Sequence, residues 1–351
     1  MQKFLRQLKR SSFYIKLMNW EYWPIYIVNI PVIFFWLYYA LRARSLFFFS
    51  AANPAIETGG VLGESKINIL RRIPQRAIPI TVFIPSGTPY ETAHEQMTSA
   101  GLDFPIIAKP NVGERGFLVA KLQTADELKA YVEAHQLDFL LQEFVAWPEE
   151  VSIMYHRFPE ADKGQITSVC VKEMLKVCGD GRSSVRELMA AKDRARLQVE
   201  RFTSENHPLL SKVPAVGEWV ELEPIGNHSR GTMFLNGNHH IDEALRAVID
   251  QMGQGMEDIF YGRFDMKCES IEALKQGRHF KVLEFNGIAS EPAHIYDPSY
   301  PIWKKYRDIF QHWGIIYRIS QVQRQRGVYG MSWKEAFVSV RNYFGYMKTA
   351  G

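Results

Sequence analysis

The chain has 351 residues, of which 46% are apolar and 23% charged; this excludes a disordered polypeptide and leaves room for two or three folded domains. Its three cysteines form no CxxC pair and are odd in number, which argues against a zinc site and a disulfide framework. The net charge of +4 is unevenly spread, because residues 1–50 carry +6, residues 301–351 carry +7 and the residues between them carry −9. Since aromatic residues are interleaved with the basic ones at both ends, we expect these ends to meet a membrane surface rather than nucleic acid.

The first fifty residues combine a basic amphipathic stretch with an uncharged apolar one. Residues 1–19 place apolar side chains at helical spacing among lysines and arginines, which is typical of a helix on a membrane surface. Residues 22–41 carry no formal charge and match one bilayer crossing in length, although Pro24 and Pro31 interrupt a helix and both flanks are basic. Two interpretations fit: a membrane-embedded segment, spanning or re-entrant, and a buried helix of a soluble domain.

Between residue 51 and residue 145 the pattern changes from irregular to regular. Residues 51–103 are rich in Gly and Pro and predict a short linker or lobe that holds one helix, from about Tyr90 to Ala100. Residues 104–122 then predict a strand, a glycine-containing turn led by Lys109 and a second strand. A capped helix and an apolar strand that ends at Glu143 follow.

The next part predicts further strands and two amphipathic pieces at the end. Residues 151–158 predict a strand, and residues 164–190 predict a strand bearing Lys172, a GDG turn and a helix capped by Ser183 or Ser184. From Pro301 onward, two amphipathic helices either complete a core or press on lipid.

Residues 261–268 and 279–287 predict two strands joined by a polar connection. Side chains alternate along a strand, so Arg263 and Asp265 share one face of the first strand, and Glu284 and Asn286 share one face of the second. If the strands pair as a hairpin, two carboxylates, an amide oxygen and a guanidinium form one patch. Mg²⁺ prefers one or two carboxylates together with substrate phosphates, and arginine suits phosphoryl oxygens, so the patch predicts a nucleotide–metal site. A solvated, charged surface hairpin is the alternative.

The order of these parts resembles the ATP-grasp superfamily of carboxylate-amine ligases, over residues 104–298. The succession of pieces carries the resemblance: FPIIAKPNVGERG, LQEFV with a second glutamate seven residues later, VCGDGRSSVREL, GNHSRGT, GRFD and LEFN. It implies an α+β ATP-grasp fold, in which two lobes sandwich ATP, with an N-terminal hydrophobic membrane-associated helical segment and a C-terminal amphipathic helical tail. The corresponding domains are a membrane-associated segment (residues 1–50), a short linker or lobe (51–103), the catalytic domain (104–300) and the basic tail (301–351).

The resemblance also implies a role for each site residue. Lys109 would hold the ATP phosphates beneath a loop whose Gly113 and Gly116 let backbone N–H groups approach the anion. Lys172 would lie near the same phosphates, unless it is a solvated strand lysine. Glu143, Phe144 and Val145 would form the adenine slot, and Glu150 would bind the ribose hydroxyls. Mg²⁺ or Mn²⁺ would be held by Asp265, Glu284 and Asn286. The catalytic residues would be Arg263, Lys109 and Lys172, with Arg263 stabilising charge on the transferred phosphoryl group.

The sequence departs from this pattern at its N-terminal side. Relatives carry a substantial α/β domain before the ATP-binding lobes, whereas here about fifty residues separate the apolar segment from Phe104. We therefore hypothesise that the apolar N-terminus, residues 53–66 and the basic tail replace that domain, and that one substrate is membrane-resident or amphiphilic. Candidate substrate contacts, each of which also fits a polar loop without a role, are Asn227, His228, Ser229, Arg230, Ser290, Glu291 and His294.

The implied reaction is the ATP-dependent joining of a carboxylate to an amine through an acyl phosphate. The sequence leaves the oligomeric state open and gives no indication of a nucleic-acid partner. Two alternatives are a kinase of the same fold and a nucleotide-binding protein that has lost catalysis and serves as a membrane scaffold. The complete set of lysine, arginine and metal-binding residues argues against the scaffold. We expect a membrane-associated protein whose catalytic domain lies in the cytoplasm.

Overall fold

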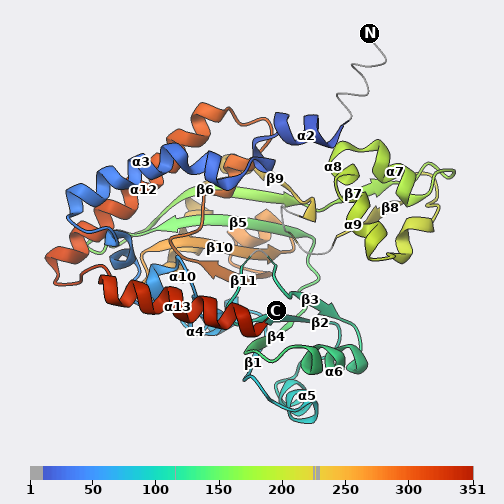
Figure 1. The fold of residues 1–351 in the computed structure, drawn as a ribbon, viewed down its shortest axis with the longest axis horizontal. Coiled ribbons are helices and arrows are strands. Elements are labelled where there is room, and N and C mark those ends of the chain that lie inside the picture. Colours follow the sequence, from blue (N-terminus) through green and yellow to red (C-terminus); the bar gives the residue numbers. More distant parts are fainter. Residues whose placement is uncertain (1–10, 115, 224–225, 227–229, 351) are drawn as a thin grey trace, which may run out of the picture.

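The computed structural model describes residues 11–114, 116–223, 226 and 230–350, which fold as a mixture of helices and antiparallel sheets (Figure 1). A five-stranded sheet lies at the centre. A four-stranded sheet forms a lobe below it in the view of Figure 1, and a two-stranded sheet belongs to a small helical lobe at the right. The predicted mixture of helices and sheets is therefore confirmed.

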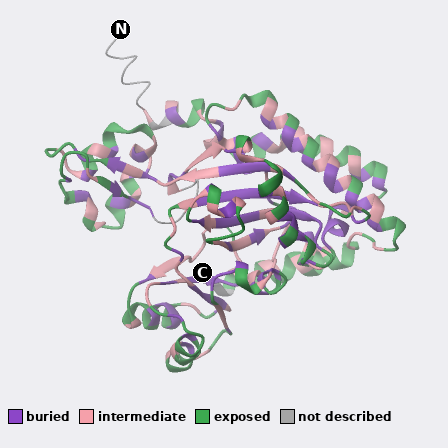
Figure 2. Ribbon diagram, turned by 180° about the vertical axis from the view of Figure 1, so that it is seen from behind, coloured by how far each residue is buried: buried purple, intermediate pink, exposed green. Residues whose placement is uncertain are grey.

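The central sheet has the strand order β11-β10-β5-β6-β9, and every neighbouring pair is antiparallel. Its strands are β5 (Glu149–His156), β6 (Gln165–Glu173), β9 (Met233–Asn236), β10 (Tyr261–Cys268) and β11 (Phe280–Asn286). Apolar side chains on one face pack against α4 (Lys66–Leu70) and α10 (Glu243–Gln254). Met154 and Tyr261, on the opposite face, pack against α3 (Ile25–Ala43) and α12 (Ile302–Gln325). The strands are therefore mostly buried on both sides (Figure 2).

Strands β10 and β11 pair as the predicted hairpin, with the short helix α11 (Ile271–Lys275) in their connection. Arg263 lies opposite Asn286, and Asp265 lies opposite Glu284. On its other side β10 pairs with β5, so that Asp265 also lies opposite Ser152. Because β10 is an interior strand and Asp265 is only 8% exposed, the alternative of a solvated surface hairpin does not hold.

The four-stranded lobe has the order β1-β4-β2-β3, with two helices on one side. Its elements are β1 (Thr81–Ile84), α5 (Tyr90–Ser99), β2 (Ile106–Pro110), β3 (Ala120–Leu122), α6 (Ala125–Ala134) and β4 (Phe139–Glu143). One apolar cluster joins α5, α6 and the sheet. The elements β1 and α5, which precede the predicted domain boundary at residue 104, thus share a core with the strands that follow it.

The small lobe lies between β6 and β9 in the chain. It contains β7 (Lys176–Cys178), α7 (Val185–Ala191), α8 (Asp193–Arg196), α9 (Val199–Ser204), η5 (Pro208–Ser211) and β8 (Trp219–Glu221). Ser184 caps α7, because its hydroxyl accepts the backbone N–H of Glu187 while the Glu187 carboxylate accepts the backbone N–H of Ser184. Of the two predicted caps, the structure thus selects Ser184.

The two ends of the chain meet on one side of the central sheet. Helix α2 (Ser12–Met18) and η1 (Trp20–Tyr22) lead into α3, and α13 (Trp333–Ala350) follows α12. Phe35 stacks on Phe310 with 4.5 Å between ring centroids, and Tyr39 stacks on Tyr317 at 4.6 Å, so α3 packs along α12. Remaining short helices are η2 (Phe48–Ala52), η3 (Glu57–Gly59), η4 (Gln75–Ala77), η7 (Asn238–His240) and η8 (Ala293–Tyr296).

The two predicted C-terminal helices differ in what they do. Helix α12 completes a core, because Ile309, Ile316 and Ile319 are buried. Helix α13 instead leaves Trp333 and Phe344 exposed. Completion of a core is therefore confirmed for α12, whereas contact of α13 with lipid stays a prediction.

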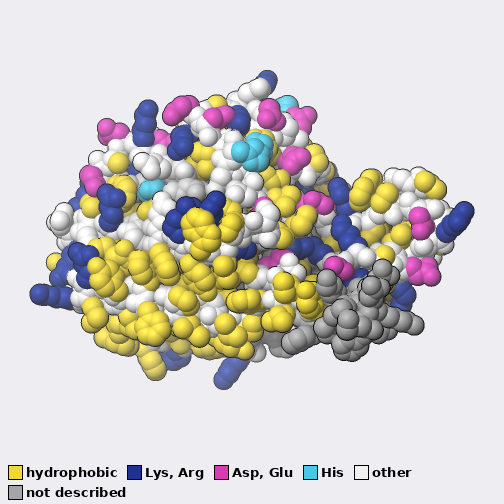
Figure 3. Space-filling model, turned by 90° about the horizontal axis from the view of Figure 1, so that it is seen from above, with side chains coloured by type: hydrophobic (Ala, Val, Ile, Leu, Met, Phe, Trp, Pro, Cys, Tyr) yellow, Lys and Arg dark blue, Asp and Glu magenta, His cyan; other side chains and the backbone are white. Residues whose placement is uncertain are grey.

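Helix α3 carries a large exposed apolar surface. Within the described residues, Tyr26–Ala43 is the one helical segment long and apolar enough to cross a membrane, although core helices and signal sequences pass the same test. Its inward side includes Val28 and Val32, while Phe34 and Leu41 are among the exposed side chains of the outward side. Figure 3 shows hydrophobic side chains gathered over the face that this helix covers. One side of the helix is therefore buried and the other exposed, and its embedding in a membrane stays a prediction.

Asn53 joins the N-terminal segment to the hairpin. Its fully buried amide donates to the carbonyls of Gly59 and Tyr261 and accepts the backbone N–H groups of Phe260 and Tyr261, at 2.8–3.0 Å. Beyond it, the chain passes so close to the end of β11 that a Cβ on Gly60 would lie 2.5 Å from the Cα of Gly287. This crossing has no room for a side chain and holds residues 59–64 beside the polar face of the hairpin.

We expect Asn53→Ala to lower the free energy of unfolding by about 3 kcal/mol, because it leaves several buried backbone groups without partners. Asn68→Ala, at an exposed position of the same segment, is the matched control and should change stability by less than about 0.5 kcal/mol. Urea unfolding followed by circular dichroism measures both. Equal effects of the two substitutions would contradict the role assigned to Asn53.

Candidate active site

One cavity of about 1460 Å³ separates the four-stranded lobe from the central sheet and continues beneath α3 and α12. Three groups of predicted site residues line it: Lys109, Gly113, Gly116, Glu143, Phe144 and Val145 from the lobe, Glu150, Lys172, Arg263 and Asp265 from the sheet, and Glu284, Asn286, Ser290 and Glu291 from β11 and the loop after it. The fold thus brings together residues that lie up to 182 positions apart in the chain, from Lys109 to Glu291.

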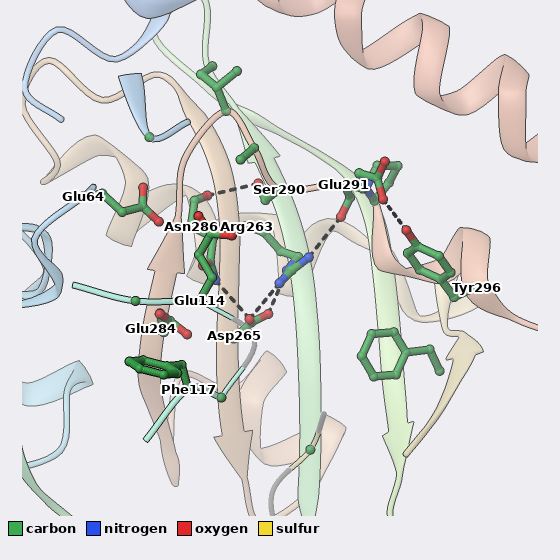
Figure 4. A pocket seen from close by; sticks show the side chains of 18 of the residues that line it. Glu64, Glu114, Phe117, Arg263, Asp265, Glu284, Asn286, Ser290, Glu291 and Tyr296 are labelled. Carbon is green, nitrogen blue, oxygen red and sulfur yellow. Dashed lines mark hydrogen bonds and ion pairs between the residues drawn. The ribbon is translucent and has the colours of Figure 1, made fainter. Parts of the chain in front are cut away.

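The centre of the cavity is an arginine–aspartate pair on β10 (Figure 4). The Nε of Arg263 donates to Oδ1 of Asp265 at 2.9 Å, and one terminal nitrogen donates to Oδ2 at 3.0 Å. The other terminal nitrogen donates to the backbone carbonyl of Glu291 at 3.2 Å. Burial alone would raise the pKa of Asp265, but Arg263 and Lys172 outweigh it and hold that pKa at about 2. The pair therefore stays ionised, and Arg263 points in a fixed direction.

The predicted metal ligands lie around this pair. The amide nitrogen of Asn286 donates to Oδ2 of Asp265 at 3.1 Å, and Oε1 of Glu284 lies 3.4 Å from the ammonium of Lys66. Within the described part of the chain, no cluster of three or more His, Cys, Asp or Glu side chains could hold a metal ion by itself. Two carboxylates and an amide oxygen nevertheless fit Mg²⁺, because this ion takes few protein ligands and completes its shell with water and phosphate oxygens. The ion pair between Lys66 and Glu284 shows that this carboxylate attracts a cation.

Lys109 and Lys172 are both buried beside the polar face. The ammonium of Lys109 donates to Oε1 of Gln142 at 2.9 Å and to the carbonyl of Leu283 at 3.0 Å, which links the lobe to the central sheet. Burial lowers the pKa of Lys109 to about 8, against the attraction of Glu284. The ammonium of Lys172 lies 2.7 Å from Oε1 of Glu150. A solvated strand lysine is therefore excluded.

Glu150, Glu143 and Phe144 all line the cavity. Glu150, the predicted ribose ligand, carries the ion pair with Lys172. Glu143, predicted at the adenine edge, accepts the backbone N–H of Ile80 at 3.1 Å. The ammonium of Lys121 lies 3.6 Å from the centre of the Phe144 ring. This end combines an aromatic face with polar edges, a combination that suits a nucleobase and its sugar.

The predicted substrate contacts divide into three groups. Ser290 and Glu291 line the cavity near Arg263. Arg230 pairs with Glu223 at 3.4 Å outside the cavity lining, and His294 is fully buried between Ser168 and Asp308 and does not line the cavity. The predicted contacts Asn227, His228 and Ser229 lie outside the described residues.

Several lining residues are not in the predicted set. Burial, together with the charge of Glu284, raises the pKa of Glu64 to about 8, so this side chain holds a proton at neutral pH. The glycine-rich surroundings of Glu64 are the signal that could have marked it. Tyr296, whose hydroxyl donates to the Glu291 carboxylate, and the tryptophans at positions 20, 23, 36 and 313 also line the cavity. For the segments that hold these tryptophans, the sequence leaves both a membrane surface and a buried core open.

No family model and no curated protein matches this chain. Among solved structures, D-alanine–D-alanine ligase from Bacillus anthracis has a TM-score of 0.44 at 12% identity, covering 77% of this chain and 71% of its own. The VanG D-Ala:D-Ser ligase from Enterococcus faecalis has a TM-score of 0.39 at 14% identity and covers 69% of this chain. A bifunctional glutathione synthetase from Pasteurella multocida has a TM-score of 0.37 at 16% identity and covers 70%.

This chain spans 57% of the VanG ligase and 36% of the glutathione synthetase. By name, two of these proteins are D-alanine-type ligases and the third is a glutathione synthetase. The resemblance to ATP-grasp carboxylate-amine ligases rests on the succession of sequence motifs.

Proposed function

We propose that the protein is an ATP-dependent ligase that joins a carboxylate to an amine through an acyl phosphate, with Mg²⁺, or Mn²⁺ in its place, beside the nucleotide phosphates. The observation that carries this proposal is the cavity in which the buried side chains of Lys109 and Lys172 meet Arg263, Asp265 and Glu284. Cations fixed in a site that excludes most water suit a reaction whose charge collects on phosphoryl oxygens.

The residues at the nucleotide end would bind and orient ATP. Phe144 and Val145 supply an apolar slot for the base, and Lys109 and Lys172 would face the phosphates. Gly113 and Gly116, which have φ values of 149° and 75°, line the same part of the cavity and leave backbone N–H groups accessible to an anion. Asp265, Glu284 and Asn286 would hold Mg²⁺, which would neutralise charge on the phosphate oxygens.

The chemistry at the other end would depend on Arg263. A substrate carboxylate oxygen bonds to the terminal phosphorus of ATP as the bond to the bridging oxygen breaks, and ADP leaves. The amine nitrogen then bonds to the carbonyl carbon, phosphate leaves and the nitrogen loses its proton. Arg263, held by Asp265 and the Glu291 carbonyl, would stabilise the charge that develops in both steps. No protein nucleophile is required.

We also propose that the protein is membrane-associated, with its catalytic domain in the cytoplasm, and that one substrate is amphiphilic. The exposed apolar side of α3, seen in Figure 3, supports the first part. Because the other side of α3 packs along α12, an orientation in the plane of the interface keeps this packing, whereas a spanning orientation would remove it. Use of ATP and the three free cysteines support a cytoplasmic location.

Asp265→Asn is expected to lower substrate-dependent ADP release at least about 100-fold, because Arg263 loses its charged partner and the metal loses a ligand. Asp126→Asn, at an exposed position of α6, is the control and should leave the rate unchanged. A coupled ADP assay with a panel of fatty acids, amino acids and alkylamines measures both. ADP release with an acid alone, unaffected by any amine, would identify a kinase, and absence of any substrate-dependent release would contradict the ligase.

ATP binding should weaken about tenfold between pH 7 and pH 9, because Lys109, with its pKa near 8, then loses the charge that attracts the phosphates. Lys109→Arg keeps a cation over this range and should remove the dependence. Calorimetric titration with ATP measures both proteins. An unchanged pH dependence in the variant would show that another group is responsible.

Replacing Phe34 and Leu41 with glutamate should reduce binding to anionic vesicles at least about tenfold, because both side chains lie on the exposed side of α3. Val216→Glu, at an exposed apolar position of the small lobe, is the control. Co-sedimentation with phosphatidylglycerol vesicles measures this difference. Equal binding of all three proteins would contradict an α3-mediated association.

A further inference from the structure

The cavity extends past Arg263 into an apolar chamber between α3 and α12. Its walls, which we call the vestibule, are formed by Trp20, Trp23, Val32, Trp36, Ile309 and Trp313. Four of the six are tryptophans, and they come from η1 and its flank, from α3 and from α12. Binding pockets for one small ligand usually measure about 300–1,000 Å³. The cavity of about 1460 Å³ therefore has room beyond its nucleotide end.

The vestibule opens on the exposed apolar surface. Val28 and Val32 line the cavity and are 6% and 7% exposed, so this side of α3 faces inward. Tyr26 and Ile33 also line the cavity, yet they are 69% and 49% exposed. Residues that belong to both the lining and the outer surface mark a mouth. An apolar chain that lay against the outer side of α3 would meet this mouth directly.

Three charged side chains lie beside the walls from η1. Lys16 and Glu21 are in the lining, and the buried ammonium of Lys305 lies 5.5 Å from the centre of the Trp20 ring. At the inner end, His312 accepts or donates one hydrogen bond with the Tyr261 hydroxyl at 2.8 Å, and burial lowers its pKa to about 3, so that it is neutral. Arg263 is then the cation that the inner end presents. Its contacts with described residues use three of the five N–H donors that a guanidinium has.

We propose that the vestibule binds the hydrocarbon chain of an aliphatic carboxylate, whose carboxylate group lies at Arg263 and whose chain points toward the mouth between Tyr26 and Ile33. This assignment rests on the proposed function, because it places the carboxylate that is to be activated beside the ATP phosphates. A guanidinium pairs well with a carboxylate, and burial of each methylene group against the apolar walls stabilises the complex. An amine head group would instead meet Arg263 as a like charge.

The assignment can be tested by quenching of the vestibule tryptophans. A brominated chain quenches tryptophan fluorescence on contact, so ω-bromoundecanoate should quench the full-length protein saturably, without ATP. β-Bromopropionate, which has the carboxylate but lacks the chain, should not quench at the same concentration. Unlabelled undecanoate should displace the probe. ω-Bromoundecylamine should bind at least about tenfold more weakly, because its charge is repelled by Arg263.

Two substitutions on α3 separate the vestibule from the outer surface. Val32→Phe fills the inward side and should weaken ω-bromoundecanoate binding about tenfold. Leu41→Phe, at an exposed position of α3 that is outside the cavity lining and away from the mouth, should leave it unchanged. Calorimetric ATP binding, equal in both variants and the parent, verifies that the nucleotide end is intact. The chain-length comparison on the unaltered protein does not depend on either variant.

Quenching that does not saturate, that is equal in Val32→Phe and Leu41→Phe, or that is as strong with bromopropionate would overturn the vestibule assignment. Tighter binding of the amine probe would overturn the carboxylate assignment. Saturable quenching without any substrate-dependent ADP release would refute the ligase and leave the chain-binding site standing. ADP release with short carboxylates and no saturable quenching would refute the chain-binding site and leave the ligase proposal standing.

Discussion

The antiparallel pairing of β10 with β11 and β5 is the constraint on which the rest of the site depends. Because residues directly opposite each other on neighbouring strands point to the same face, this register gathers Arg263, Asp265, Glu284 and Asn286. The next row continues across the sheet, with Lys267 opposite Glu150 and Glu150 opposite Lys172. A shift by one residue would turn all these side chains into the apolar core beneath β10. Burial of Phe264 and Met266 on that side therefore fixes the position of the charges.

The charges of the site are balanced within the protein before any ligand binds. Asp265 accepts from Arg263, Ser152 and Asn286, while Lys172 is paired with Glu150. Pairing of this kind offsets the desolvation of buried ions and keeps each group in one orientation. Lys109 differs, because its ammonium is held by an amide and a carbonyl rather than by a carboxylate. It is therefore the buried cation with most to gain from an anionic ligand.

The local part of this structure could be predicted from the sequence, and the long-range part could not. The hairpin, the strand bearing Lys109 and the cap at Ser184 follow from alternation and capping patterns within a few residues. Asn53 could not be identified, because its partners at positions 260 and 261 lie more than 200 residues away. For the tryptophans, the sequence leaves both a lipid surface and a buried core open, and only the packing of α3 on α12 shows which of them line the cavity. His294 is the opposite case: it is predicted as a substrate contact because it follows β11 closely, yet it is buried and hydrogen-bonded to Ser168 and Asp308.

The contact between α3 and α12 has a consequence for synthesis of the chain. The Tyr306 hydroxyl that donates to the Val28 carbonyl lies 278 residues after it. At a ribosomal rate of about 5–20 residues per second, α3 would wait on the order of 15–60 seconds before α12 emerges. During that interval the inward side of α3 lacks its partner from the finished fold. Early capture of α3 by lipid or by a chaperone would therefore protect the nascent chain, and α12 would close the catalytic cavity late in synthesis.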